Sequence, residues 1–181
     1  MPIPPGSYRF GPDNGTLQVN TGRTGAVARA GHDLLIRVTG WDATLTVADD
    51  PAASRVEARA DGGALRVLEG TGGMQALDDD DRRNIAQTID EEVLNRQEVT
   101  FRSTQVEAAG EGLRVQGDMT LLGRTHPITL AVEPAADGTL TAVTTIRQTD
   151  FGIKPYSALF GALKVADEVR VTLTAPLPQS L

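Results

Sequence analysis

The stretch that decides the fold is GLRVQGDMTLLGRTHPITLAVEP, residues 112–134. Apolar and polar side chains alternate on both sides of a central turn, and this period of two is typical of strands with one buried face. The turn is predicted over residues 122–127, because Gly123 tolerates unusual backbone angles and Pro127 has no N–H to pair. The stretch therefore predicts a long antiparallel hairpin. An isolated hairpin is barely stable in water, so other strands must cover its apolar face.

The rest of the chain reads mainly as further short strands. Turn sequences separate them at residues 12–15, 49–51, 61–63 and 137–138. The alternation changes parity where Gly40 meets Trp41, which predicts a β-bulge or a tight bend. Many short alternating strands with turns between them predict an all-β antiparallel barrel or sandwich.

Two segments have helical spacing instead. In residues 78–95, Ile85, Ile89 and Val93 recur every four residues. The four aspartates at 78–81 are expected to cap this helix; the alternative, a divalent cation, would need the spaced ligands of a calcium loop. Residues 156–165 (YSALFGALKV) predict a short apolar helical segment before the last strand.

Composition limits the classes of function. The 181 residues predict one domain with its own core, and 40% hydrophobic residues exclude disorder. No apolar run approaches a membrane span, and cysteine is absent. The net charge of −7, without a basic stripe, argues against nucleic-acid binding. The start MPIPPGSYRF does not look like a secretion signal, so if it is the natural start we expect a cytoplasmic protein.

Residues that could carry catalysis are scarce. His32 and His126 are the two histidines, and neither lies in a cluster spaced for a metal, so no metal site is expected. There is no Gly-x-Ser-x-Gly elbow, and the Asp-Phe-Gly sequence at 150–152 lacks the other kinase motifs. We therefore expect no enzyme.

Several segments match a known family in order along the chain. They are GDMTL (117–121), GRTHPITL (123–130), DPAAS (50–54), TFRS (100–103), DFGI (150–153) and VADEV (165–169). Together they resemble the YceI-like, polyisoprenoid-binding, lipocalin-like family. The resemblance implies a single lipocalin-like antiparallel β-barrel over residues 1–181. The strand pattern gives this barrel about eight strands, and the α-helix predicted over residues 78–95 is a longer insert than is usual in the family. The resemblance also implies a hydrophobic channel for a polyprenyl chain, such as that of an isoprenoid quinone, and no other cofactor.

The inward faces of the predicted strands are rich in small apolar residues, which favours a barrel wide enough to hold a ligand. The expected channel lining is Ile36, Val38, Trp41, Leu45, Val56, Ala58, Phe101, Val115, Met119, Leu121, Ile128, Leu130, Ala142, Phe151 and Val171. Polar groups at the channel mouth would orient the head of a ligand. The expected mouth or lid residues are His32, Arg37, Tyr156, Leu159 and Phe160.

Two other classes of function stay open. In a scaffold protein, large side chains such as Trp41, Phe101 and Met119 would fill the barrel, and residues 156–165 would pack on a partner or on a second copy of the chain. An enzyme would need titratable groups that converge on the cavity, and the inward positions are nearly all apolar. For residues 156–165 a lid, a homodimer contact and a plug of the barrel end are the three alternatives.

Overall fold

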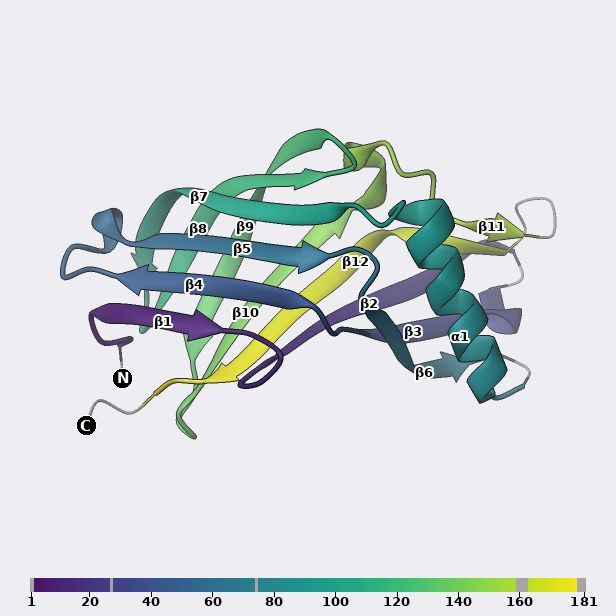
Figure 1. The fold of residues 1–181 in the computed structure, drawn as a ribbon, viewed down its shortest axis with the longest axis horizontal. Coiled ribbons are helices and arrows are strands. Elements are labelled where there is room, and N and C mark those ends of the chain that lie inside the picture. The colour runs from purple at the N-terminus through teal and green to yellow at the C-terminus, as the bar shows by residue number, and fades with distance from the viewer. Residues whose placement is uncertain (1, 27, 74, 159–162, 179–181) are drawn as a thin grey trace.

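A single antiparallel sheet makes up most of the structure, a computed structural model that describes residues 2–26, 28–73, 75–158 and 163–178 (Figure 1). Within these residues twelve strands join the sheet, and eleven form one continuous path, β1-β4-β5-β7-β8-β9-β10-β12-β2-β3-β6. The strands are β1 (Gly6–Phe10), β2 (Thr16–Thr24), β3 (His32–Val38), β4 (Trp41–Val47), β5 (Arg55–Asp61), β6 (Leu65–Gly72), β7 (Glu98–Ala109), β8 (Gly112–Leu121), β9 (Arg124–Pro134), β10 (Thr139–Arg147), β11 (Ser157–Ala158) and β12 (Leu163–Pro176). The path curls strongly, so the antiparallel all-β fold is confirmed, whereas the prediction of about eight strands is wrong.

Two bends explain part of the larger number of strands. β3 continues into β4 past Gly40, and β5 continues into β6, so that β3 pairs with β6 and β4 with β5. The backbone pairing persists across the bend, where Thr39 N donates to Ala64 O at 2.8 Å and Asp61 N donates to Gly40 O at 2.9 Å. A side chain at Gly40 would lie 2.9 Å from the Cβ of Ala64, so only glycine fits there. The bend predicted at Gly40 is confirmed.

The central hairpin is β8 and β9, with Leu113 opposite Val132 and Val115 opposite Leu130. Its turn is tighter than predicted. Leu122 and Gly123 alone connect the strands, with φ values of 53° and 72°, as a two-residue turn of type I′ requires. Residues 124–127 therefore belong to β9 and not to the turn, and His126 lies opposite Met119.

The predicted helix is present as α1 (Asp79–Thr88), followed by a π-helical turn, η3 (Ile89–Val93). Asp78 caps it: its side chain accepts a hydrogen bond from Asp81 N at 2.7 Å, while Asp81 accepts one from Asp78 N at 3.1 Å. This reciprocal capping box confirms the capping role predicted for the aspartates. None of the helices in the described part of the chain has the length and apolar character needed to cross a bilayer.

Residues 156–165 are not helical in the part that the structure describes. β11 pairs with the start of β12, with Ser157 opposite Lys164, and Val165 N donates to Tyr156 O at 2.9 Å. β12 also pairs with β2 from Lys164 onward. These ladders satisfy the backbone groups, so tertiary pairing overrides the helical spacing of the sequence. Leu159 and Phe160 lie outside the described residues.

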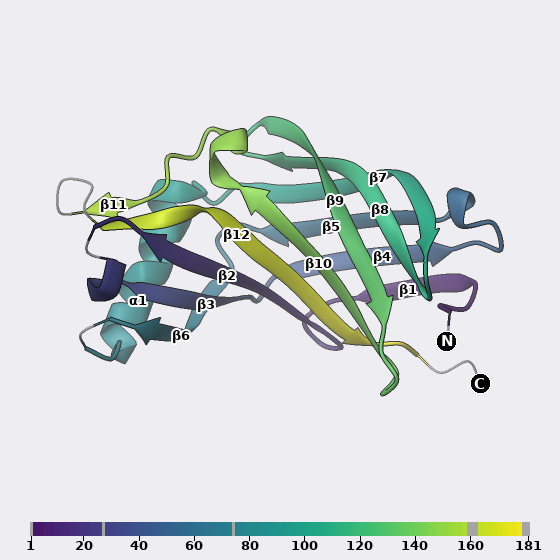
Figure 2. The ribbon, with the colours of Figure 1, turned by 180° about the vertical axis from the view of Figure 1, so that it is seen from behind.

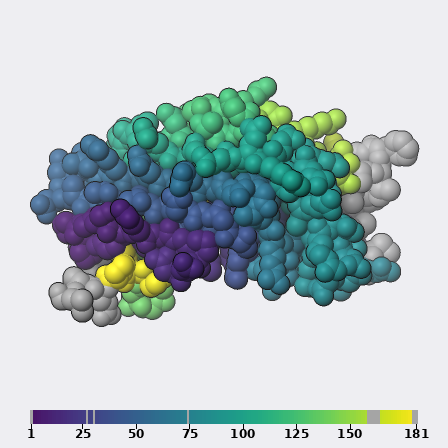
Figure 3. Space-filling model, viewed as in Figure 1, coloured from purple at the N-terminus to yellow at the C-terminus, as the bar shows by residue number. Residues whose placement is uncertain are grey.

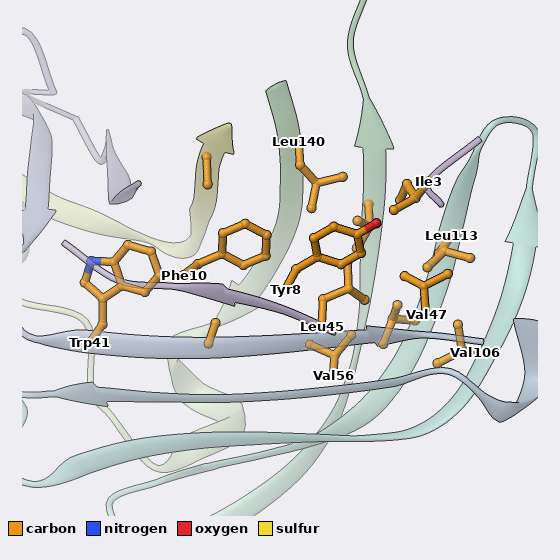
Figure 4. Close-up of a cluster of buried hydrophobic side chains, with 14 of the residues drawn as sticks. Ile3, Tyr8, Phe10, Trp41, Leu45, Val47, Val56, Val106, Leu113 and Leu140 are labelled. Carbon is orange, nitrogen blue, oxygen red and sulfur yellow. The ribbon is translucent and has the colours of Figure 1, made fainter. Parts of the chain in front are cut away.

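The end of the barrel next to β1 is filled by side chains. Figure 4 shows Trp41, Phe10 and Tyr8 in a row, with Ile3 and Leu113 beyond them. All five are buried, and Tyr8 donates a hydrogen bond from its hydroxyl to Pro4 O at 2.7 Å. Aromatic side chains bury large apolar areas, so this cluster closes one end of the barrel.

A 3₁₀ turn, η4 (Gln148–Phe151), completes the wall between β9 and β10. These strands pair from Leu140 with Pro134 to Val143 with Ala131 and then diverge (Figure 2). η4 contacts both of them and β12, and its Phe151 is only 1% exposed. Phe151 packs in a second buried cluster with Leu121, Ile146, Ile153 and Val169.

Candidate functional site

An apolar cavity of about 650 Å³ occupies the barrel between the filled end and α1. Alternate residues of the strands line it, because successive side chains of a strand point to opposite faces of the sheet. Small side chains such as Ala43, Ala58 and Ala142 leave the space, while Trp41 and Phe10 form its floor. Ligand pockets in proteins typically measure about 300–1,000 Å³ and are mostly apolar.

α1 and η3 cover the opposite end of the barrel. Figure 1 shows the helix lying across the strand ends, and Figure 3 shows the same teal segment at the far end of the surface from the purple β1. The side chains of Ile85, Ile89 and Val93, together with Leu94, line the cavity. These four are half-buried, so the helix covers the cavity through an apolar stripe without being part of the core.

We expect Ile89→Asp to destabilise the protein by about 1–3 kcal/mol, the cost of burying a polar group without a partner. Ile89 lines the cavity, so the new carboxylate would face apolar side chains. Chemical denaturation followed by circular dichroism measures the change. The control is Gln87→Asp, two residues away at an exposed position of α1, which should change stability by less than about 0.5 kcal/mol. Equal effects of the two substitutions would contradict the docked position of the helix.

One group of polar lining residues lies where β2, β3 and β12 meet the helical end; a second group, with Asp42, Arg59 and Asp61, lies on β4 and β5. Arg23, His32 and Lys164 belong to the first group, with Tyr156 and Gln148. Arg23 donates from Nη1 to Gly31 O, and its Nε lies 3.5 Å from Asp33 Oδ1. His32 Nε2 forms a 2.7 Å hydrogen bond with Gln75 O. This part of the rim is the mouth of the cavity: polar side chains at the edge of an apolar chamber.

η4 is fastened to β12 beside the mouth. The Asp167 carboxylate accepts hydrogen bonds from Thr149 Oγ1 at 2.6 Å and from Thr149 N at 2.9 Å. Gln148 donates from Nε2 to Ala166 O at 2.9 Å. Both hydrogen bonds from Thr149 lower the pKa of Asp167, and the bond from the hydroxyl contributes more than the bond from the amide. The ionised form of the Asp167 carboxylate therefore holds η4 in place.

This pKa shift predicts a pH dependence of stability. Because the folded-state pKa of Asp167 is lowered, its contribution is present above the unfolded-state pKa of about 4 and is lost as the pH falls through the folded-state value. We expect Asp167→Asn to lower the melting temperature at neutral pH, and the difference from wild type to shrink as the pH falls below the unfolded-state pKa and through the lowered folded-state pKa. Thermal unfolding over that pH range measures it. Asp49→Asn, at an exposed turn, is the control and should show no such pattern; a difference for Asp167→Asn that is the same at every pH would contradict the prediction.

The second histidine lies on the outer side of η4. His126 Nε2 is 3.3 Å from Asp150 Oδ2, and its ring meets Phe151 edge-on with centroids 5.9 Å apart. Within the described ranges, no group of three His, Asp or Glu side chains is arranged to hold a metal ion. His126 therefore helps to fix η4 against β9 and is not among the cavity lining.

The sequence of residues 8–177 matches the family model of the YceI-like domain. The chain belongs to the YceI-like family. No protein with a curated description matches it in sequence. Among solved structures, its YceI-like barrel is similar to BcnA of Burkholderia cenocepacia, with a TM-score of 0.65 and 17% identity over 89% of this chain and 96% of BcnA. It is also similar to the YceI protein of Campylobacter jejuni, with a TM-score of 0.56 and 10% identity over 81% and 85% of the two chains. At such identities the structural likeness concerns the fold alone.

Most of the residues predicted as channel lining do face the cavity of this YceI-like barrel; their contact with a ligand stays a prediction. Those that line the cavity are Ile36, Val38, Trp41, Leu45, Val56, Ala58, Phe101, Met119, Leu121, Ile128, Leu130, Ala142 and Val171. Val115 does not, because it is fully buried in the filled end. Phe151 does not either, because it fills the wall between β9 and β10.

Of the predicted mouth residues, His32 and Tyr156 line the cavity. Arg37 does not: Ile36 and Val38 on either side of it face inward, so its side chain lies on the outer face of β3. Leu159 and Phe160, predicted as a lid, fall outside the described residues. Sequence reasoning did not identify Arg23, Lys164 or the helix residues as lining, because their place depends on how β2, β12 and α1 meet. The glycines at 70–73 were the one sequence feature that could have indicated this part of the lining, because Gly72 and Gly73 leave room for the side chains of Arg23 and His32.

Proposed function

We propose that this YceI-like protein binds one elongated apolar lipid in its barrel, as a carrier or store. The observation that supports this most directly is the apolar cavity of about 650 Å³ between the filled end and the helix. The resemblance to the polyisoprenoid-binding family supports a prenyl chain, as in an isoprenoid quinone. The proposed ligand contacts are the inward apolar residues named above, with the mouth at the β2, β3 and β12 end.

Volume sets the length of chain that fits. At about 30 Å³ for each group the size of a water molecule, the cavity accommodates roughly 20 carbon-sized groups, or about four isoprene units. Burying a methylene contributes about 0.8 kcal/mol, so four units contribute on the order of 15 kcal/mol. Association costs about 4–15 kcal/mol, so chains much shorter than this would bind weakly.

Native mass spectrometry of the purified protein, with lipid extraction, tests the proposal. We expect a mass increase that corresponds to one lipid, and a delipidated protein that takes up one geranylgeraniol molecule per chain. The same spectra report the mass of the assembly, which tests the alternative of a homodimer. A protein that carries no lipid and takes up none would support the alternative, a scaffold, and would overturn the proposal.

The mostly apolar lining fits a role in binding better than a role in catalysis. Its two acidic residues, Asp42 and Asp61, each accept a hydrogen bond from another group of the protein. Asp42 accepts a hydrogen bond from Arg59 at 2.9 Å, and Asp61 accepts one from Gly63 N at 2.8 Å. The cytoplasmic location and the lack of a nucleic-acid partner stay predictions from the sequence.

A further inference from the structure

We propose that the lipid carries an anionic head, a phosphate or a carboxylate, held at the mouth by Arg23 and Lys164 with His32 beside them. This inference rests on the proposed function, because it concerns the head of the same ligand. The observation that supports the inference is the positive charge of the side chains at the mouth. Although the chain has a net charge of −7, Arg23 and Lys164 are the charged residues that line this part of the rim.

The two cations come from neighbouring strands. β12 pairs with β2, with Val165 opposite Arg23 and Lys164 opposite Thr24, so Arg23 faces the barrel interior beside Val165, and Lys164, one residue before Val165, borders the cavity from the exposed rim. The Lys164 ammonium has no acidic partner among residues 2–26, 28–73, 75–158 and 163–178. It is exposed, so it is free to meet a charged head at the edge of the cavity.

Arg23 is held in place and retains a free donor. Gly31 O and Asp33 engage Nη1 and Nε, and the side chain is 26% exposed. Within the described part of the chain, Nη2 has no hydrogen-bond partner. A fixed guanidinium with a donor to spare suits the oxygens of a phosphate or carboxylate.

Two glycines make room for these side chains. Any side chain at Gly72 would collide with the Arg23 guanidinium, and any side chain at Gly73 would collide with the His32 ring. Both glycines have positive φ, 80° and 71°, which other residues rarely adopt. Gly72, at the end of β6, and Gly73, which follows it, thus have a physical role: they let a cation and an imidazole lie at the mouth.

The carboxylates nearby have other partners. Asp78 and Asp81 form the capping box of α1. Asp80 pairs with Arg83, and Asp79 lies 3.7 Å from Arg82. Asp33 contacts Arg23 and is not part of the cavity lining. Asp33 therefore orients Arg23, the four aspartates of α1 cap the helix or pair with its arginines, and none of these contacts involves Lys164.

Three lipids with the same C20 prenyl chain test the inference: geranylgeranyl phosphate, geranylgeranoic acid and geranylgeraniol. Each would displace retinol, whose fluorescence is excited by energy transfer from Trp41, the single tryptophan of the chain, which lines the cavity. We expect at least one anion to bind about tenfold more tightly than the alcohol at low salt, within the range that one hydrogen bond between charged groups supplies. The advantage should shrink as salt is raised.

Arg23→Gln and Lys164→Gln should each remove most of that advantage, because each lowers the affinity for the anion more than the affinity for the alcohol. Arg170→Gln is the control, because it removes an exposed cation from β12 between the inward Val169 and Val171. If Arg23→Gln disturbs folding through the loss of its Asp33 contact, Lys164→Gln decides, since it has no acidic partner to lose within the described ranges.

The outcomes separate the two proposals. A tighter phosphate indicates a prenyl phosphate, and a carboxylate that binds as well or better indicates a fatty acid; either result supports an anionic head. Equal affinities for all three lipids in the wild type would overturn the inference and leave the proposed function intact. Failure of all three lipids and of retinol to bind would overturn the proposed function itself.

Discussion

Replacing Ala58 with phenylalanine is expected to lower lipid affinity at least tenfold and to leave the fold intact. Ala58 lies on β5 opposite Ala43 and Phe101, and all three line the cavity. The substitution adds six carbon atoms, which at about 30 Å³ each occupy roughly 180 Å³, more than a quarter of the cavity. The added ring enters existing space, so overpacking should cost little, in contrast to a substitution in a filled core.

Retinol fluorescence and native mass spectrometry with geranylgeraniol measure the effect. Ala142→Phe on β10 lines the same cavity from another strand and should act in the same way. The matched control is Ala131→Phe, an exposed position on β9 between the inward Leu130 and Val132, which adds the same ring outside the barrel. Uptake that is unaffected by both inward substitutions would show that lipid does not occupy this space.

Phe151→Ala is expected to destabilise the protein by about 3–5 kcal/mol, the range for truncating a buried aromatic side chain. Phe151 is 1% exposed and closes the wall where β9 and β10 diverge. Its removal leaves a void among Leu121, Ile146 and Ile153, and the His126 ring loses its edge contact. Denaturant unfolding measures the loss of free energy.

Tyr156→Ala is the control for this truncation. Tyr156 is 57% exposed, so losing its ring should cost less than about 1 kcal/mol. Phe151→Leu, which keeps an apolar side chain, should fall between the two. A loss below about 1 kcal/mol for Phe151→Ala would mean that η4 does not support the wall.

The similarity to BcnA and to the Campylobacter jejuni protein extends over most of each chain, although identity is at most 17%. A curled sheet can tolerate such divergence, because its fold depends on which positions face inward and not on which apolar residue occupies them. Chemistry at the rim is free to differ, and the cations proposed here to recognise the ligand head lie there.

The sequence by itself determined the strands, their inward faces and the helix. Alternation has a period of two in a strand whatever its partners are, so Ile128 and Leu130 could be assigned to the inner face from their spacing alone. The cap of α1 is equally local, because Asp78 and Asp81 satisfy each other's backbone groups within four residues. The bend at Gly40 was visible as a change of parity.

Only the tertiary structure decided where the inner face is filled and where it is empty. Val115 and Leu130 pair across one hairpin and share the inner face, yet Val115 is sealed in the core and Leu130 lines the cavity. Their difference comes from residues far away in sequence, since Tyr8 and Phe10 fill one end of the barrel while α1 spans the other. The mouth likewise joins Arg23 and Lys164, more than a hundred residues apart, through the pairing of β2 with β12. No local pattern encodes such a meeting, because long-range pairing between strands determines it.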